Sequence, residues 1–132
     1  TLRWSHWGPV STDGGRTIAT EWTANSRVRT FQALWGMNHA ETYADFETAL
    51  RHWDVPMQNI LVGAPGDTIA IRSTRYLPIR ADGTGYGVRD GSSPGSEWTG
   101  RVPFDELPHV INPDRGYIAS TNQRPADETY PY

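Results

Sequence analysis

Residues 60–71 read ILVGAPGDTIAI, and this stretch sets the fold class of the chain. Its two ends are short runs rich in β-branched residues, which favour strands. The four residues between them, APGD at 64–67, are typical of a tight turn. The pattern predicts an antiparallel hairpin with strands at 60–62 and 68–71.

Two helices are expected before this hairpin. Between about residues 26 and 37, apolar side chains recur at helical spacing. The second helix begins at Asn38, which forms a capping-box-like pair with Glu41, and it ends before Pro56. The apolar positions of the two helices are Val28, Phe31, Leu34 and Trp35 in the first, and Tyr43, Phe46, Leu50 and Trp53 in the second. A helical pair beside an antiparallel sheet defines an α+β fold.

The rest of the chain divides into three parts. Residues 1–20 read as a strand, a turn at TDGG (12–15) and a returning strand. Residues 81–97 are rich in Gly, Asp and Ser, which predicts an ordered surface loop or a lid. Near the end, GYIASTNQRP (116–125) predicts a strand over 116–121 that runs into a polar cluster without an acid, a histidine or a cysteine.

Composition narrows the class of protein. The 132 residues suit one domain, and six Trp, six Tyr and three Phe suggest a core or a pocket built around aromatic side chains. With 12 Arg, no Lys, 15 acids and a net charge of −3, nucleic acid is not an expected partner. There are no cysteines, and we expect no signal peptide and no membrane span because no apolar run is long enough.

Candidate catalytic and metal-binding residues are weak when each is taken alone. No two of the four histidines are spaced as metal ligands; they are His6, His39, His52 and His109. Asp82–Gly85 begins like a calcium loop but lacks the later ligands, and Gly83–Gly87 lacks the strand and helix of a phosphate-binding loop. Ser92 and Ser93 are not in a nucleophile elbow. Thr1 could serve as a terminal nucleophile, or could simply be where this piece of chain begins.

Four motifs in order resemble the penicillin amidase family, self-processing hydrolases with an N-terminal nucleophile. They are WDVPMQN (53–59), DTIAIR (67–72) with LPIR (77–80), EWTGRVPFDELP (97–108), and NP (112–113) with GYIA (116–119). Residues 1–45 match less closely, through HWGPV (6–10) and ATEWT (19–23). GAP at 63–65 departs from the family pattern, which suggests a remodelled hairpin turn.

The resemblance implies a four-layer αββα sandwich with two antiparallel sheets between helical layers. Residues 1–132 would form a single partial domain from the β-chain of an autoproteolytically processed zymogen. The expected partners are the α-chain, the nucleophile-bearing part of the β-chain, which lies upstream, and a small-molecule amide. The family implies a periplasmic or secreted location. No cofactor is expected, although calcium is possible in the complete enzyme, with no ligands identifiable here.

The resemblance also implies an activity: cleavage of the amide of an N-acylated small molecule, such as a β-lactam or an N-acyl homoserine lactone, through an acyl-enzyme. Asn122 matches the oxyanion-hole Asn, and Gln58 matches a position lining the acyl pocket, which Trp35 would also approach. Without the resemblance, Asn122 reads as a strand cap and Trp35 as a packing residue. Asn59 is expected to bond backbone, and Arg80 a loop acid or a substrate carboxylate. The alternative function is an inert structural or binding module.

Overall fold

The computed structural model describes residues 2–82 and 85–132. The chain divides into two compact units. The first comprises the residues up to 27 together with 78–101, and the second comprises 28–77 together with 102–132.

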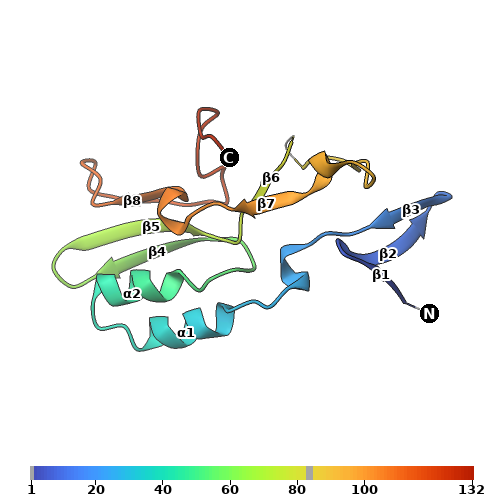
Figure 1. Cartoon of the computed structure of the whole chain (residues 1–132). Coiled ribbons are helices and arrows are strands. Elements are labelled where there is room, and N and C mark those ends of the chain that lie inside the picture. The colour runs from blue at the N-terminus through green and yellow to red at the C-terminus, as the bar shows by residue number, and fades with distance from the viewer. Residues whose placement is uncertain (1, 83–84) are drawn as a thin grey trace. The chain divides into compact units, whose positions relative to one another are not determined.

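The first unit is built from short antiparallel strands (Figure 1). Its three-stranded sheet has the order β1-β2-β3, and β6 pairs with β7. The bounds of its elements are β1 (Arg3–Ser5), β2 (Gly8–Asp13), β3 (Arg16–Ala19), η1 (Thr23–Asn25), β6 (Pro78–Arg80), η2 (Pro94–Ser96) and β7 (Trp98–Arg101). The predicted strand, turn and returning strand within residues 1–20 are therefore confirmed.

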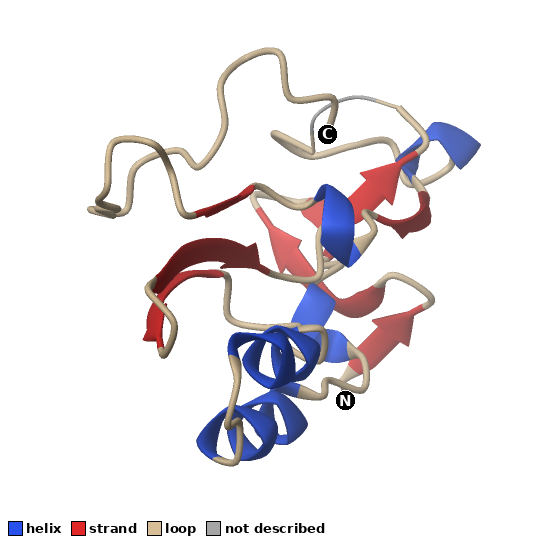
Figure 2. Ribbon diagram, turned by 90° about the vertical axis from the view of Figure 1, so that its left-hand side faces the viewer, coloured by secondary structure: helices blue, strands red, loops and turns tan. Residues whose placement is uncertain are grey.

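The second unit places a helical pair beside a three-stranded antiparallel sheet with the order β4-β5-β8. Its elements are α1 (Thr30–Asn38), α2 (Tyr43–Leu50), β4 (Gln58–Ala64), β5 (Thr68–Thr74), η3 (Phe104–Glu106) and β8 (His109–Ile111). The hairpin predicted around residues 60–71 is confirmed, with strands longer than the sequence pattern indicates. Figure 2 shows the two helices as neighbouring coils on one side of the hairpin.

The register of the hairpin decides which side chains face the helices. Ile60 lies opposite Arg72, and Asn59 lies opposite Ser73. Arg72 bonds to Glu47 of α2, so its face of the sheet is the helical one. Because side chains alternate along a strand, Asn59 and Ser73 lie on the opposite face. The two faces therefore carry different chemistry.

Helix α2 begins four residues later than its sequence pattern predicts. Thr42 is the N-cap: its hydroxyl accepts from the backbone N–H of Asp45 at 3.1 Å, and the Asp45 carboxylate accepts from the Thr42 N–H at 3.0 Å. Asn38 instead ends α1, where its side chain donates to the carbonyl of Leu34. The predicted capping box was therefore wrong, because Thr42 and Asp45 satisfy the exposed N–H groups reciprocally.

Helix α1 starts where a distant carboxylate caps it. Asp54 is 3% exposed and accepts from the backbone N–H of Arg29 at 2.9 Å, while its two oxygens also receive the Arg29 guanidinium. A negative charge at a helix N-terminus is stabilising. The Thr30 hydroxyl adds a bond to the carbonyl of Val55 at 2.6 Å. These contacts explain why the helix begins at residue 30 rather than near residue 26.

The strand predicted over residues 116–121 is absent from this described segment. Residues 116–118 line a cavity together with residues of β4 and β5 and do not pair with a strand. Side chains replace the missing ladder, since the guanidinium of Arg115 donates to the carbonyl of Tyr117 and the amide of Gln123 donates to that of Ala119. The prediction was wrong because alternation alone does not supply a partner strand.

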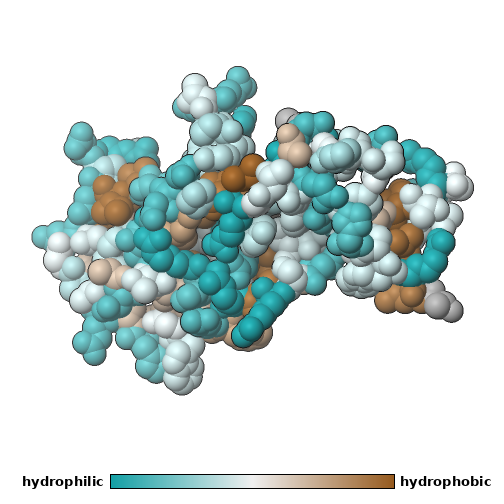
Figure 3. Space-filling view, in the orientation of Figure 1, coloured by the Kyte–Doolittle hydropathy of each residue, from teal (hydrophilic) through white to brown (hydrophobic). Residues whose placement is uncertain are grey.

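The buried core is small and mostly aliphatic. Among the described residues, its apolar members are Ala33, Ala49, Leu50, Ala70, Val102, Phe104 and Leu107, all in the second unit. Only one of them is aromatic, so of the two expectations, an aromatic core or an aromatic pocket, the first was wrong. Phe31 and Trp35 on α1 are 87% and 71% exposed. The face seen in Figure 3 carries separate brown areas within a largely hydrophilic surface.

The predicted surface loop at 81–97 is confirmed for its described residues. Asp90 accepts from the backbone N–H and hydroxyl of Ser92, and the hydroxyl of Ser96 donates to the Asp90 carbonyl at 2.6 Å. An ion pair joins Arg89 to Asp82.

None of the helices described here has the length and apolar character that a membrane crossing requires.

The two helices approach most closely at Gly36, and a substitution there should show it. A Cβ added to Gly36 would lie 2.8 Å from the Cβ of Ala49. We expect Gly36→Ala to destabilise the protein by about 1–3 kcal/mol through overpacking, which exceeds the roughly 1 kcal/mol that alanine gains over glycine in a helix. Urea unfolding measures the change. Gly63→Ala is the control, since an added Cβ meets nothing within 4 Å. A stabilised Gly36→Ala variant would contradict the close approach.

Candidate functional site

The candidate site lies beneath the C-terminal loop, residues 112–132, which follows β8 (Figure 1, red). Irregular segments longer than about 12–15 residues are uncommon in compact domains and are often functional. Asn112 secures one end, because its side chain and backbone exchange hydrogen bonds with Ile69 at 2.8 and 2.9 Å. Tyr130 secures the other end by donating to the carbonyl of Glu106 at 2.9 Å, and Tyr132 bonds to the Glu106 carboxylate.

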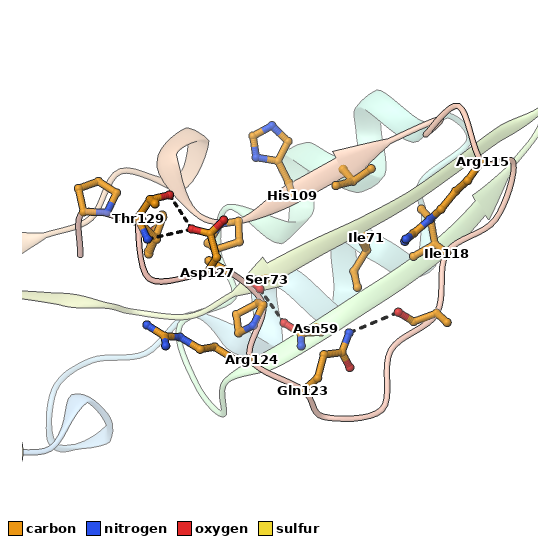
Figure 4. Close-up of a pocket in the computed structure, with 17 residues that line it drawn as sticks. Asn59, Ile71, Ser73, His109, Arg115, Ile118, Gln123, Arg124, Asp127 and Thr129 are labelled. Carbon is orange, nitrogen blue, oxygen red and sulfur yellow. Dashed lines mark hydrogen bonds between the residues drawn. The ribbon is translucent and has the colours of Figure 1, made fainter.

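A cavity of about 510 Å³ opens between this loop and the sheet face that carries Asn59 and Ser73. The Ser73 hydroxyl donates to the side-chain oxygen of Asn59 at 2.6 Å, which links β5 to β4 at the cavity wall. Figure 4 shows the loop crossing in front of the two strands, with Gln123 close to Asn59. The backbone N–H of Thr121 donates to the Gln123 side chain at 2.6 Å and so shapes the loop at this point.

The charges lining the cavity are predominantly positive. Its lining includes two arginines, Arg115 and Arg124, and one carboxylate, Asp127. His109 also lines the cavity. Hydrogen bonds from the hydroxyl and the backbone N–H of Thr129, at 2.5 and 2.9 Å, hold the pKa of Asp127 below its usual range, with a smaller contribution from the charge of Arg124. Asp127 is therefore ionised at neutral pH, and Thr129 bonds to one of its two carboxylate oxygens, Oδ1.

Asn122 is exposed on the C-terminal loop, and its backbone is in the left-handed region with φ 61°. Asparagine is one of the few residues with a side chain that adopts this conformation readily. Its amide forms no hydrogen bond with another described residue. It does not cap a strand, since the described segment before it is not one. The amide N–H groups are thus available to an external acceptor.

The two predicted acyl-pocket residues lie elsewhere in the second unit. Gln58 is the exposed first residue of β4, and by alternation from Asn59 it belongs to the helical face of the sheet. Trp35 is exposed on α1, where its ring stacks on that of His39 with centroids 4.3 Å apart. Neither residue lines the cavity beneath the loop, and neither does Asn122. The chain by itself does not gather the three predicted site residues into this cavity.

Three residues of the site were not assigned to it from sequence. Asn59 bonds to the Ser73 side chain rather than to the backbone expected, because the two are paired across the hairpin. Ser73 carried no sequence signal. Arg124 stands two residues after Asn122 in the polar cluster, and that cluster was the available signal.

Arg80 lies in the first unit, where its charge opposes the burial that raises the pKa of Glu21.

The described residues contain no group of three or more His, Asp or Glu side chains placed to hold a metal ion. The calcium-loop and phosphate-loop patterns at 82–87 lie partly outside the described residues, as does Thr1. Ser92 and Ser93 belong to the surface loop, and Ser93 caps the short helix η2. Neither serine lies in a strand-to-helix turn.

Comparison with known proteins shows which protein family and which solved structures the chain is similar to. The sequence model of the penicillin amidase family matches residues 1–132. The chain is 30% identical over 101 residues to penicillin acylase 2 proenzyme from Pseudomonas sp. (strain SE83), covering 76% of this chain and 13% of that protein. The solved structure of a thermostable penicillin G acylase from Alcaligenes faecalis superposes with a TM-score of 0.82 at 22% identity, covering 99% of this chain and 25% of that one.

The fold is therefore that of part of an N-terminal nucleophile hydrolase, α+β with antiparallel sheets. The chain belongs to the penicillin amidase family. It spans only 13% of the curated relative and a quarter of the solved chain, so most of the length of either protein has no counterpart in these residues.

Proposed function

We propose that these residues form part of an acylase that cleaves the amide of an N-acylated small molecule through an acyl-enzyme. Family membership supports amide hydrolysis as the reaction class. The nucleophile would come from the remainder of the β-chain, and the α-chain would complete the enzyme. A proenzyme is the form named for the Pseudomonas relative, in keeping with autoproteolytic processing.

The observation that carries this proposal is the uncommitted amide of Asn122. When a nucleophile attacks an amide carbonyl, the oxygen becomes negative and is stabilised by donors already in place. The left-handed backbone holds Asn122 at a fixed turn, and no described residue competes for its N–H groups. A side-chain amide also donates without a proton to lose, so its role would not change with pH.

Gln58 and Trp35 would contribute to the acyl pocket of the complete enzyme. Both are exposed here and both lie on the helical side of the second unit, so further parts of the protein could cover them. The Gln58 amide would make the pocket more polar than an aliphatic side chain would. The presence of calcium in the complete enzyme and a periplasmic or secreted location remain predictions.

Acyl release by the complete, processed protein tests the function. We expect anilides with a phenylacetyl or a short polar acyl group to be hydrolysed, because an acyl-enzyme forms and is then attacked by water. Released amine is followed by absorbance, and intact mass spectrometry detects both the acyl adduct and the processed N-terminus. The control is the same protein alkylated at its new N-terminus. A correctly processed protein that releases no acyl group would instead favour an inert structural or binding module.

A further inference from the structure

Arg124 is an exposed cation of the cavity beneath the C-terminal loop. It lines the cavity, and no other described residue forms a hydrogen bond or ion pair with its guanidinium. Its charge acts on Asp127, whose Oδ1 accepts from the hydroxyl and the N–H of Thr129. Figure 4 shows Arg124 and Arg115 at opposite ends of the cavity. Unlike Arg124, Arg115 already donates to the carbonyl of Tyr117 at 2.9 Å.

We propose that Arg124 binds a carboxylate on the amine portion of the substrate. A planar guanidinium matches a carboxylate through two parallel hydrogen bonds. With two arginines and one acid among its lining residues, the cavity has an excess of positive charge that an anionic group would balance. This inference rests on the proposed function, because it uses Asn122 to place the scissile carbonyl.

The spacing along the loop suits such a substrate. Arg124 is two residues from Asn122, so their Cα atoms are within about 7 Å of each other. In an N-acyl amino acid, the carboxylate follows the scissile amide by one backbone repeat, about 3.8 Å. The side chain of Arg124 is long enough to reach a carboxylate at that distance from the carbonyl bound by Asn122. A substrate whose carbonyl oxygen is bound by Asn122 would therefore present its carboxylate near Arg124.

The alternation of β4 assigns the carboxylate to the amine rather than to the acyl group. Gln58, the proposed acyl-pocket residue, lies on the helical face of the sheet, whereas Asn59 and the cavity lie on the other face. The acyl and amine portions would thus extend to different sides of the scissile bond. The substrate class is then an N-acyl amino acid or an N-acylated β-lactam nucleus, both of which carry a carboxylate. An N-acyl homoserine lactone has none.

Two substrates that differ only in that group test the inference: phenylacetylglycine and phenylacetylglycinamide. In the complete, processed enzyme we expect kcat/KM to favour the carboxylate, and we expect Arg124→Gln to reduce that ratio by about tenfold to a hundredfold. Arg124→Lys should retain part of the preference, and added salt should weaken it. Arg16→Gln, at an exposed arginine of β3, is the matched control and should leave the ratio unchanged.

The outcomes separate this inference from the proposed function. If neither these compounds nor the anilides are hydrolysed, the proposed function fails, and calorimetric binding of the same two compounds still decides the role of Arg124. A ratio, or a binding preference, that is equal in wild type and Arg124→Gln overturns the assignment. It is also overturned if Arg124→Gln instead removes a preference for a glutaryl over a phenylacetyl group, since the carboxylate site would then serve the acyl portion.

Discussion

Replacing Asn122 with glycine in the complete, processed enzyme is expected to lower kcat by about 10²–10³-fold, the loss typical of removing one oxyanion donor. Glycine is the sharper choice because it removes the amide yet adopts the positive φ of 61° without strain. KM should change little, since the donor acts on charge that develops only in the transition state. Steady-state kinetics on an anilide substrate measures both constants.

Two further replacements at Asn122 separate chemistry from conformation. Asn122→Ala removes the same amide but disfavours the left-handed backbone by about 1–2 kcal/mol, so it should lose the same kcat and also some stability. Asn122→Asp keeps the size and the turn but opposes a developing oxyanion with negative charge. Retention of wild-type kcat by the glycine variant, with an unchanged melting temperature, would remove Asn122 from the oxyanion hole.

Removing Glu47 should produce the largest loss of stability. Arg72 is 5% exposed; it bonds to Glu47, donates to the carbonyl of Phe104 and stacks on its ring, 4.4 Å from the centroid. Without Glu47 the nearest full charge to the buried guanidinium is the exposed carboxylate of Asp105, 4.0 Å away, which solvent screens. We expect Glu47→Ala to lower the free energy of unfolding by about 3–5 kcal/mol, as for other broken buried pairs. The urea midpoint and the melting temperature record the change.

The matched controls distinguish a buried charge from a lost contact. Replacing both partners, Glu47→Leu with Arg72→Met, should recover much of the loss because an apolar pair has no desolvation cost. Asp105→Ala breaks the exposed pair with Arg51, whose nitrogens lie 2.7 and 3.0 Å from the carboxylate, together with a longer contact of 4.0 Å to Arg72. Solvent screens exposed pairs, so this variant should change stability much less. Equal losses in Glu47→Ala and Asp105→Ala would contradict the prediction, because the contact of Arg72 with Glu47 would then contribute no more than the exposed contacts of Asp105.

Local interactions explain which parts of the fold were predictable. The hairpin of β4 and β5 was predicted because its strands and turn are adjacent in sequence. The start of α1 was not, because its cap is Asp54, 25 residues away from Arg29. Residues 116–121 alternate as a strand does, but an alternating pattern shows only that two faces differ. It does not show whether a partner edge is present.

The site was predictable to a similar degree. Asn122 and its polar neighbours stand out in the sequence, and the family resemblance assigned them a role. The neighbouring cavity could not be predicted in the same way. It is formed by the pairing of Asn59 with Ser73 and by the return of the C-terminal loop across the sheet face that carries them. Both depend on contacts between residues far apart in the chain. Arg124 therefore gained its significance only when the neighbouring charges were known.

The short helix η3 contacts both the core of the second unit and the C-terminal loop. Phe104 and Asp105 contact the two arginines Arg51, which follows α2, and Arg72 of β5. The next residue, Glu106, accepts hydrogen bonds from the two tyrosines at the end of the C-terminal loop. The order of the C-terminal loop and the stability of the core therefore both depend on contacts made by η3. Substitutions on its two sides share partners, so their free energies are not additive. A substitution in η3 is therefore expected to change both the order of the C-terminal loop and the melting temperature of the fold.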